Sequence, residues 1–285
     1  MRYILLIFLL ILPLTADAEI NALREEINRL RGVLFELYIQ RDLSAESYLV
    51  TNLSQGRVVA HKNTKKQYPI ASITKMMSSA VALENIDPQE RVTLSARMLE
   101  PYGHSPSLFL GLNVSAQNLL KASLIQSTND ASEALTFFLE EGEFLRLMNS
   151  KAEEIGMHNT IFYDAHGLNP SNRSTALDLT RLLVYVYQNH PWILETTKDD
   201  NFWLPDSRGV WLKFKNVNNF HSHSDFLGSK TGYLPQAKQT FVALFNFNGD
   251  LFAVTLLYSK NRQRDMEKIL YHLNGTKTNP GNSSL

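Results

Sequence analysis

Apolar residues recur at regular steps along most of this chain, and the step changes from one segment to the next. Over residues 20–41 the apolar positions lie three or four residues apart, at Ile20, Leu23, Ile27, Leu30, Leu34 and Leu37. This spacing predicts an amphipathic helix. A free coiled coil would use the same spacing, but fewer than three heptads are present, so we expect the helix to pack against a sheet.

Strand-like patterns occupy both ends of the remaining chain. Residues 48–51 and 58–61 flank a short turn, which predicts an early hairpin. Near the other end, the runs FVALFNF and DLFAVTLLY flank Asn248-Gly249, which is a strong hairpin signal. Strand character also appears near residues 210–219.

Between these ends the apolar spacing is mainly helical. Residues 72–84 predict one helix, and residues 85–194 predict a lobe of several more, separated by loops with Gly or Pro. Residues 260–273 predict a last helix. We therefore expect an α+β fold, in which an antiparallel sheet is built from both chain ends. Helices 20–41 and 260–273 would pack on one face of the sheet, with a cleft between sheet and lobe.

Residues 1–18 have the pattern of a secretory signal peptide. Arg2 precedes an apolar run, and Ala16 and Ala18 offer small side chains before a cleavage point. The run is shorter than the ~20 residues that a membrane-spanning helix needs. We expect export to the periplasm or outer cell envelope, with membrane contact only through an uncleaved signal segment.

The exported chain is expected to contain an N-terminal helix at 19–44, one main domain at 45–274 and a polar tail at 275–285. Its charge is balanced, with 28 Lys and Arg against 28 Asp and Glu, so no basic field favours nucleic acid. Cysteine is absent, which excludes disulfides and a thiol nucleophile. An apolar content of 44% suffices for a packed core.

Three short motifs follow in order: Ser72-Ile73-Thr74-Lys75, Ser127-Thr128-Asn129 and Lys230-Thr231-Gly232. Ser72 and Lys75 stand three residues apart at a predicted helix start, so both side chains project from one face. The helix N-terminus supplies free N–H groups and positive potential that favour an oxyanion. A lysine whose pKa is lowered by burial, or by a second cation such as Lys230, can take the proton of the serine hydroxyl.

The first two motifs also have a purely structural interpretation. Ser72 is a favoured helix-capping residue, and Ser127 with Asn129 fits a helix stop and restart. The first two motifs are short enough to occur by chance in such a chain. Gly232 near a strand indicates close approach of another backbone, here a substrate peptide, and Lys230 offers positive charge to an anionic ligand.

The chain resembles the serine D-Ala-D-Ala carboxypeptidases among the low-molecular-mass penicillin-binding proteins. The resemblance covers most of residues 45–274 and includes three segments outside the motifs: SPSLFLGLN (105–113), TIFYDAHGLNP (160–170) and NVNNF (216–220). It implies a β-lactamase/DD-peptidase-like version of the α+β fold, with no cofactor and no metal. It also implies hydrolysis of the D-Ala-D-Ala region of peptidoglycan stem peptides, and inhibition by β-lactams.

The resemblance implies catalytic roles for three side chains. Ser72 would be the acylated nucleophile, Lys75 its general base, and Ser127 the relay that passes a proton to the leaving amine. The backbone N–H groups of Ser72 and Tyr233 would form the oxyanion hole that acyl transfer needs.

Substrate binding is assigned by the same resemblance to the other motif residues. Asn129 would bind a peptide amide of the substrate. Lys230 and Thr231 would hold the terminal carboxylate, and Gly232 would leave room for the substrate backbone.

Three positions depart from the family's pattern. Thr128 stands where a small residue is common, which could narrow the cleft. Leu234 replaces a Thr, and Lys238 replaces a usual glycine before the last hairpin. The sequence also lacks the β-rich second domain and the C-terminal anchor of many members. This favours a freely soluble enzyme and makes endopeptidase activity on peptidoglycan cross-links the alternative to carboxypeptidase activity.

Other functions fit less well. A class A β-lactamase needs a glutamate before Leu168-Asn169, where this chain has Ala165. A scaffold with a dead site is disfavoured by the intact Ser72 and Lys75. A metal site would have to use His221-Ser222-His223 with Asp225, whose flanking polar residues favour a solvated loop.

Overall fold

The computed structural model describes residues 17–23, 25–27, 30, 33, 37, 41–101, 108–206 and 208–275. Nearly all of the predicted signal peptide and of the predicted polar tail lies outside these residues. Within the described part of the chain, no helix is long and apolar enough to cross a membrane.

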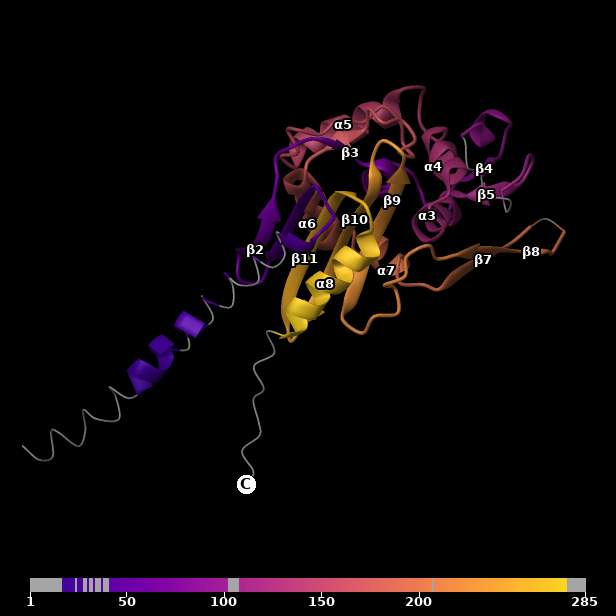
Figure 1. Ribbon diagram of the computed structural model, residues 1–285. Helices are drawn as coiled ribbons and strands as arrows, with labels where there is room; N and C mark the ends of the chain where they lie inside the picture. The colour runs from indigo at the N-terminus through magenta and orange to yellow at the C-terminus, as the bar shows by residue number, and fades with distance from the viewer. Residues whose placement is uncertain are drawn as a thin grey trace, which may run out of the picture.

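A five-stranded antiparallel sheet joins the two ends of the chain (Figure 1). Its strand order is β2-β1-β11-β10-β9, so the early hairpin lies beside the late one, as predicted. Asn248 and Gly249 both have positive φ in the turn between β10 and β11. The strands are β1 Ser47–Asn52, β2 Arg57–Lys62, β9 Phe226–Leu234, β10 Lys238–Phe247 and β11 Asp250–Ser259.

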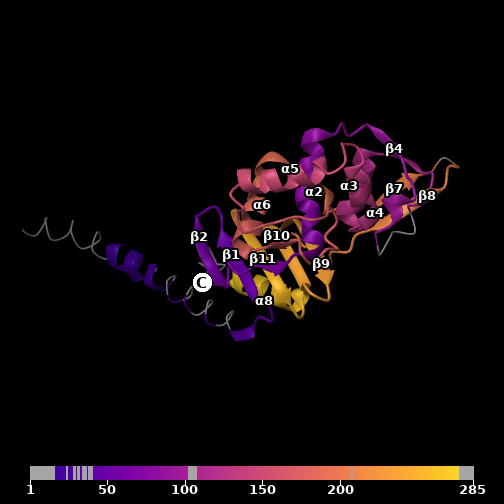
Figure 2. The same ribbon diagram turned by 90° about the horizontal axis from the view of Figure 1, so that it is seen from above.

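Helices cover both faces of this sheet (Figures 1 and 2). Helix α8, Arg262–Gly275, packs on β10 and β11 and buries Met266 and Ile269 there. Helix α6, Ala176–Asn189, contacts β1, β10 and β11 from the opposite face. The other helices are α2 Thr74–Asn85, α3 Ala116–Ile125, α4 Asn129–Thr136, α5 Glu143–Glu154 and α7 Pro191–Thr196.

Short elements connect the larger ones. Two 3₁₀ turns are η1, Ala71–Ile73, and η2, Arg97–Leu99. Three small antiparallel pairs complete the structure: β3 Tyr68–Pro69 with β6 Arg173–Ser174, β4 Arg91–Thr93 with β5 Asn113–Ser115, and β7 Asn201–Pro205 with β8 Trp211–Lys215.

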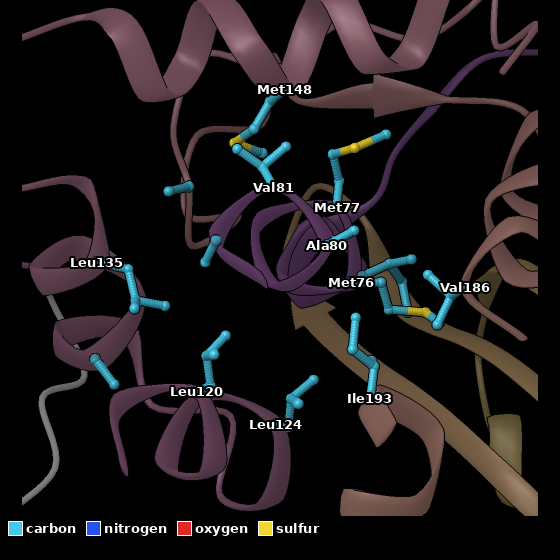
Figure 3. Close-up of a cluster of buried hydrophobic side chains, with 14 of the residues drawn as sticks. Met76, Met77, Ala80, Val81, Leu120, Leu124, Leu135, Met148, Val186 and Ile193 are labelled. Atoms are coloured by element: carbon cyan, nitrogen blue, oxygen red, sulfur yellow. The ribbon is translucent and has the colours of Figure 1, made fainter. Parts of the chain in front are cut away.

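Helix α2 runs through the centre of the helical lobe (Figure 3). Its residues from Thr74 to Ala82 are all buried, and apolar side chains of α3, α5, α6 and α7 surround it. A helix that is enclosed on all sides has no solvent-facing stripe. The polar side chains of α2 between Thr74 and Ala82, including Lys75, are therefore held away from water.

One packing prediction is wrong, and one predicted strand lies outside the main sheet. The described residues of the predicted helix 20–41 do not pack on the sheet as expected: Ile20, Leu23 and Ile27 are 47%, 62% and 41% exposed. Figure 1 shows the described residues 17–23 leading away from the sheet. Helix α8 packs on β10 and β11 from one face and α6 on β1, β10 and β11 from the other, and an apolar stripe in the sequence does not indicate which surface it packs against. The strand predicted near 210–219 is β8, which pairs with β7 outside the main sheet.

Candidate active site

Ser72 lies in η1, directly before α2, at the boundary between the helical lobe and the edge strand β9. Two glycines allow this close packing. A Cβ on Gly167 would stand 2.1 Å from the Ala71 carbonyl oxygen, and one on Gly232 would stand 3.0 Å from the Ser72 nitrogen. Ala71 itself has a φ of 50°, a strained conformation of the kind that concentrates at functional sites. The backbone around Ser72 thus packs closely against Gly167 and against Gly232.

Lys75 is fully buried one turn further along, and its amine donates to three oxygens. These are Ser72 Oγ at 3.1 Å, Asn129 Oδ1 at 2.8 Å and the backbone carbonyl of His166. Burial lowers the pKa of Lys75 to about 7, although the nearby carboxylates of Asp164 and Asp130 act in the opposite direction. The structure therefore confirms that Ser72 and Lys75 share one face, with an amine that loses its proton near neutral pH.

A side chain of the third motif, on β9, is hydrogen-bonded to a side chain of the second motif, between α3 and α4. Lys230 is buried, and its amine donates to Ser127 Oγ at 2.8 Å and to the Thr231 carbonyl oxygen at 3.1 Å. Ser127 has a φ of 61° between α3 and α4, so it too is held in a strained backbone conformation. Burial lowers the pKa of Lys230 well below its usual value, and the positive charges of Lys75 and Arg262 lower it further.

The third motif lies on β9, the edge strand of the sheet. Thr231 and Gly232 are buried there, whereas the side chain of Tyr233 is exposed. The space beside Gly232 is filled by Thr240 Oγ1, the Ile70 carbonyl oxygen and the Ser72 nitrogen. All the residues predicted to form the site thus gather at one edge of the sheet, while the oxyanion role of Tyr233 stays a prediction.

A loop at residues 164–169 contributes groups that sequence reasoning did not assign. The Asp164 carboxylate accepts from the backbone N–H groups of Gly167 at 2.5 Å and Asn169 at 2.6 Å. This fixes the loop so that the His166 carbonyl meets the Lys75 amine. Every residue has a backbone carbonyl, so the sequence could not indicate that this one accepts from Lys75. The segment TIFYDAHGLNP, which resembles the family, does contain the loop.

The imidazole of His166 faces two carboxylates, with Nε2 3.6 Å from Glu133 and Nδ1 3.4 Å from Asp164. Its pKa is nevertheless lowered to about 4, mainly by burial, with the charge of Lys75 adding to the effect and Asp164 opposing it. A neutral imidazole at this place supports a positioning contact between α4 and the loop.

Arg262 is the other group that sequence reasoning missed. It belongs to α8, far from the motifs in sequence, and its Nη1 donates to the Gly232 carbonyl oxygen at 2.8 Å. Burial lowers its pKa, but a guanidinium stays charged in proteins. The Lys-Thr-Gly strand is therefore flanked by a fixed positive charge.

The structure shows what two of the three positions that depart from the family's pattern do. Thr128 does not narrow the cleft, because it is buried in the lobe and its hydroxyl donates to the Ala122 carbonyl at 2.9 Å. Lys238 adopts the left-handed conformation that a glycine would favour, with a φ of 51°. Its amine lies 4.2 Å from the centroid of the Tyr258 ring.

The His-Ser-His segment does not converge on one centre. His221 Nε2 lies 2.6 Å from Asp200, while His223 Nδ1 lies 3.9 Å from Asp225. Among the described residues, no group of three or more His, Asp or Glu side chains is arranged to hold a metal ion.

Comparisons with known proteins agree with the geometry. Residues 36–257 match the model of a family described as D-alanyl-D-alanine carboxypeptidase. A D-alanyl-D-alanine endopeptidase of Pseudomonas aeruginosa is 32% identical over 222 residues, which cover 74% of this chain and 70% of the relative.

Solved structures of similar proteins share the fold. A D-alanyl-D-alanine carboxypeptidase from Mycobacterium tuberculosis has 25% identity and a TM-score of 0.75, with 84% of this chain and 93% of that chain covered. Penicillin-binding protein D2 from Listeria monocytogenes, solved in a cefotaxime-bound form, has 26% identity and a TM-score of 0.71, covering 81% and 97%. The chain therefore belongs to the D-alanyl-D-alanine carboxypeptidase family of serine DD-peptidases.

Proposed function

We propose that this chain is an exported enzyme that hydrolyses the D-Ala-D-Ala region of peptidoglycan stem peptides through an acyl-enzyme on Ser72. One observation supports this most directly: the buried Lys75 amine lies 3.1 Å from Ser72 Oγ and has a pKa of about 7. A base with a pKa near the working pH is the best compromise between being deprotonated and accepting a proton.

In the proposed acylation, Ser72 Oγ attacks the carbonyl carbon of the scissile amide while Lys75 takes the hydroxyl proton. The backbone N–H groups of Ser72 and Tyr233 stabilise the resulting oxyanion. When the amide bond breaks, Ser127 donates its hydroxyl proton to the leaving amine of D-alanine and regains one from protonated Lys75, which becomes neutral again; Lys230 donates to Ser127 Oγ at 2.8 Å. Water then attacks the Ser72 ester, which releases the shortened peptide and returns the proton to the serine.

Binding of the substrate is assigned to the groups around β9. Asn129 orients a peptide amide, whereas Gly232 lets β9 pack closely on the backbone before Ser72 and, contrary to the expectation from the sequence, does not leave room for the substrate. Lys230 and Thr231 hold the terminal carboxylate, and the charge of Arg262 adds to the attraction. A bound carboxylate would favour protonated Lys230, which counteracts the lowering of its pKa by burial.

Two cleavage specificities fit this chemistry. Carboxypeptidase activity on a free stem needs only a pocket for the terminal D-alanine carboxylate, and Lys230 with Arg262 supplies positive charge there. Endopeptidase activity on cross-linked peptides is the alternative, favoured by the named activity of the Pseudomonas aeruginosa relative. The predicted signal peptide at residues 1–18 supports a location in the periplasm or outer envelope, where both substrates occur.

The test is intact mass against time for the chain mixed with benzylpenicillin. We expect a lasting single adduct on Ser72, because a β-lactam acylates the nucleophile that attacks D-Ala-D-Ala. The Ser72→Ala variant should lose both the adduct and peptide hydrolysis while keeping its unfolding temperature. Rapid consumption of the drug without an adduct would indicate a β-lactamase, and neither adduct nor drug loss would indicate a dead site.

A further inference from the structure

The hairpin β7–β8 extends from the helical lobe beside α3 (Figures 1 and 2). Its register pairs Trp203 with Lys213 and Pro205 with Trp211. Because opposite and alternate residues of a hairpin share a face, these four side chains lie on one side of the ribbon. We call Trp203, Pro205, Trp211, Lys213 and Lys215 the tryptophan face.

The opposite side of the hairpin is part of the core. Phe202 and Phe214 stack there with ring centroids 5.4 Å apart, and Leu204 is buried beside them. This side packs on α3, where the Lys121 amine lies 5.4 Å from the Phe202 ring centroid. The core therefore fixes which side of the ribbon faces outward.

The tryptophan face presents large aromatic groups to solvent. Trp203 and Trp211 are 49% and 62% exposed and are diagonal neighbours, about 7 Å apart at Cβ. The Lys213 amine lies 5.0 Å from the Trp203 ring centroid, a cation–π contact that restrains the indole. Exposed aromatic pairs flanked by cations are typical of interaction sites.

Hydrogen bonds and an ion pair join the described residues at the tip of the hairpin. The Asp206 carboxylate accepts from the backbone N–H groups of Arg208 and Val210, both at 2.8 Å. The Arg208 guanidinium binds the same carboxylate at 2.7 Å and lies 5.5 Å from the Phe109 ring centroid. A surface that is ordered before binding loses less conformational entropy when a partner arrives.

The segment after β8 connects this face to the catalytic cleft. The Val217 N–H donates to the Ile125 carbonyl at 3.2 Å, two residues before Ser127. The Asn218 amide donates to Ser229 Oγ at 2.8 Å, and Ser229 directly precedes Lys230. The segment that follows the tryptophan face in the chain therefore contacts the residues next to both Ser127 and Lys230.

We propose that the tryptophan face binds the glycan strands of peptidoglycan, and so holds the enzyme on the polymer whose stem peptides it cleaves. The inference rests on the proposed function. Indole rings stack on the C–H faces of sugar rings, since the negative face of the indole attracts weakly positive hydrogens. Lys213 and Lys215 complement the carboxylates of the stem peptides that branch from the same strand.

The experiment measures binding of the full chain to purified peptidoglycan sacculi by sedimentation. The variant Trp203→Ala/Trp211→Ala is compared with Tyr271→Ala, which removes a 76% exposed aromatic side chain from α8. We expect about tenfold weaker binding for the double variant and wild-type binding for Tyr271→Ala. The ratio of activity on sacculi to activity on a short D-Ala-D-Ala peptide should fall about tenfold as well.

A second variant, Lys215→Glu, tests the charge without touching the rings and should also weaken sacculus binding. Equal binding by wild type and the tryptophan variant would overturn the proposal. So would tryptophan-dependent binding to vesicles of phosphatidylglycerol and phosphatidylethanolamine without sacculus binding, which would indicate a membrane surface. The proposed function is tested separately from sacculus binding. It would be wrong if the wild-type chain neither formed the benzylpenicillin adduct nor cleaved the short peptide.

Discussion

The two buried lysines of the site differ in the charges that surround them. Lys75 lies on the enclosed helix α2, where the carboxylates of Asp164 and Asp130 partly offset burial and leave its pKa at about 7. Lys230 lies on the edge strand β9, where the charges that act on it are the cations Lys75 and Arg262. The protein thus supplies carboxylates near Lys75, whereas under the proposed function the carboxylate near Lys230 would be that of the substrate. The difference supports the proposal that Lys75 on α2 is the base and that Lys230 on β9 binds the substrate carboxylate.

Among the variants that test this comparison, replacement of Lys75 should have the largest effect, because it removes the proposed base. We expect Lys75→Met to slow benzylpenicillin acylation about a thousandfold, because general-base catalysis by a positioned group is lost. Time-resolved intact mass gives the rate. The matched control is Lys198→Met, which replaces an exposed lysine just after α7 and should acylate at the wild-type rate. Near-normal acylation of the Lys75 variant would move the base to another residue.

Lys230 should contribute to kcat/KM by binding the C-terminal carboxylate of the substrate. We expect Lys230→Met to lower kcat/KM about a hundredfold for a peptide ending in D-Ala-D-Ala, because a buried charged contact is lost. For the same peptide with a C-terminal amide the loss should be much smaller. Steady-state hydrolysis of both peptides gives the loss of kcat/KM for each. Equal losses would show that Lys230 does not bind the carboxylate.

The pH profile tests the pKa of Lys75. Below a pH of about 7 the amine is protonated and cannot act as the base, so acylation should fall about tenfold per pH unit. Above that pH the rate should level off. The measurement is the benzylpenicillin acylation rate against pH. A rate that stays level through pH 6 would contradict a base with this pKa.

The fixed charge beside β9 should have the smallest effect. We expect Arg262→Gln to lower kcat/KM about threefold, mainly through KM, because the guanidinium adds long-range attraction for an anionic substrate. The variant Arg262→Lys keeps the charge and should recover much of the loss. If Arg262→Lys were as impaired as Arg262→Gln, the bond to the Gly232 carbonyl, rather than charge, would be the important contribution.

Much of the fold followed from local patterns. The hairpin around Asn248-Gly249, the helix after Ser72 and the helical lobe were all predicted, since alternation, helical spacing and turn residues act over short distances. Strand β7 was missed because NFWLP is short and ends in Pro205. The docking of residues 20–41 on the sheet was wrong, since periodicity indicates an apolar stripe but not whether a sheet face remains free to cover it.

The sequence alone determined the order of the three motifs, the resemblance to serine DD-peptidases and the residues expected at the site. Tertiary structure decided the chemistry of those residues. It buried Lys75 on the enclosed helix α2 and brought the His166 carbonyl to its amine, and it set Arg262 beside Gly232. These are contacts between residues remote in sequence. A pKa set by burial and a partner that is a backbone carbonyl arise only when distant segments pack together, because neither depends on neighbouring residue types.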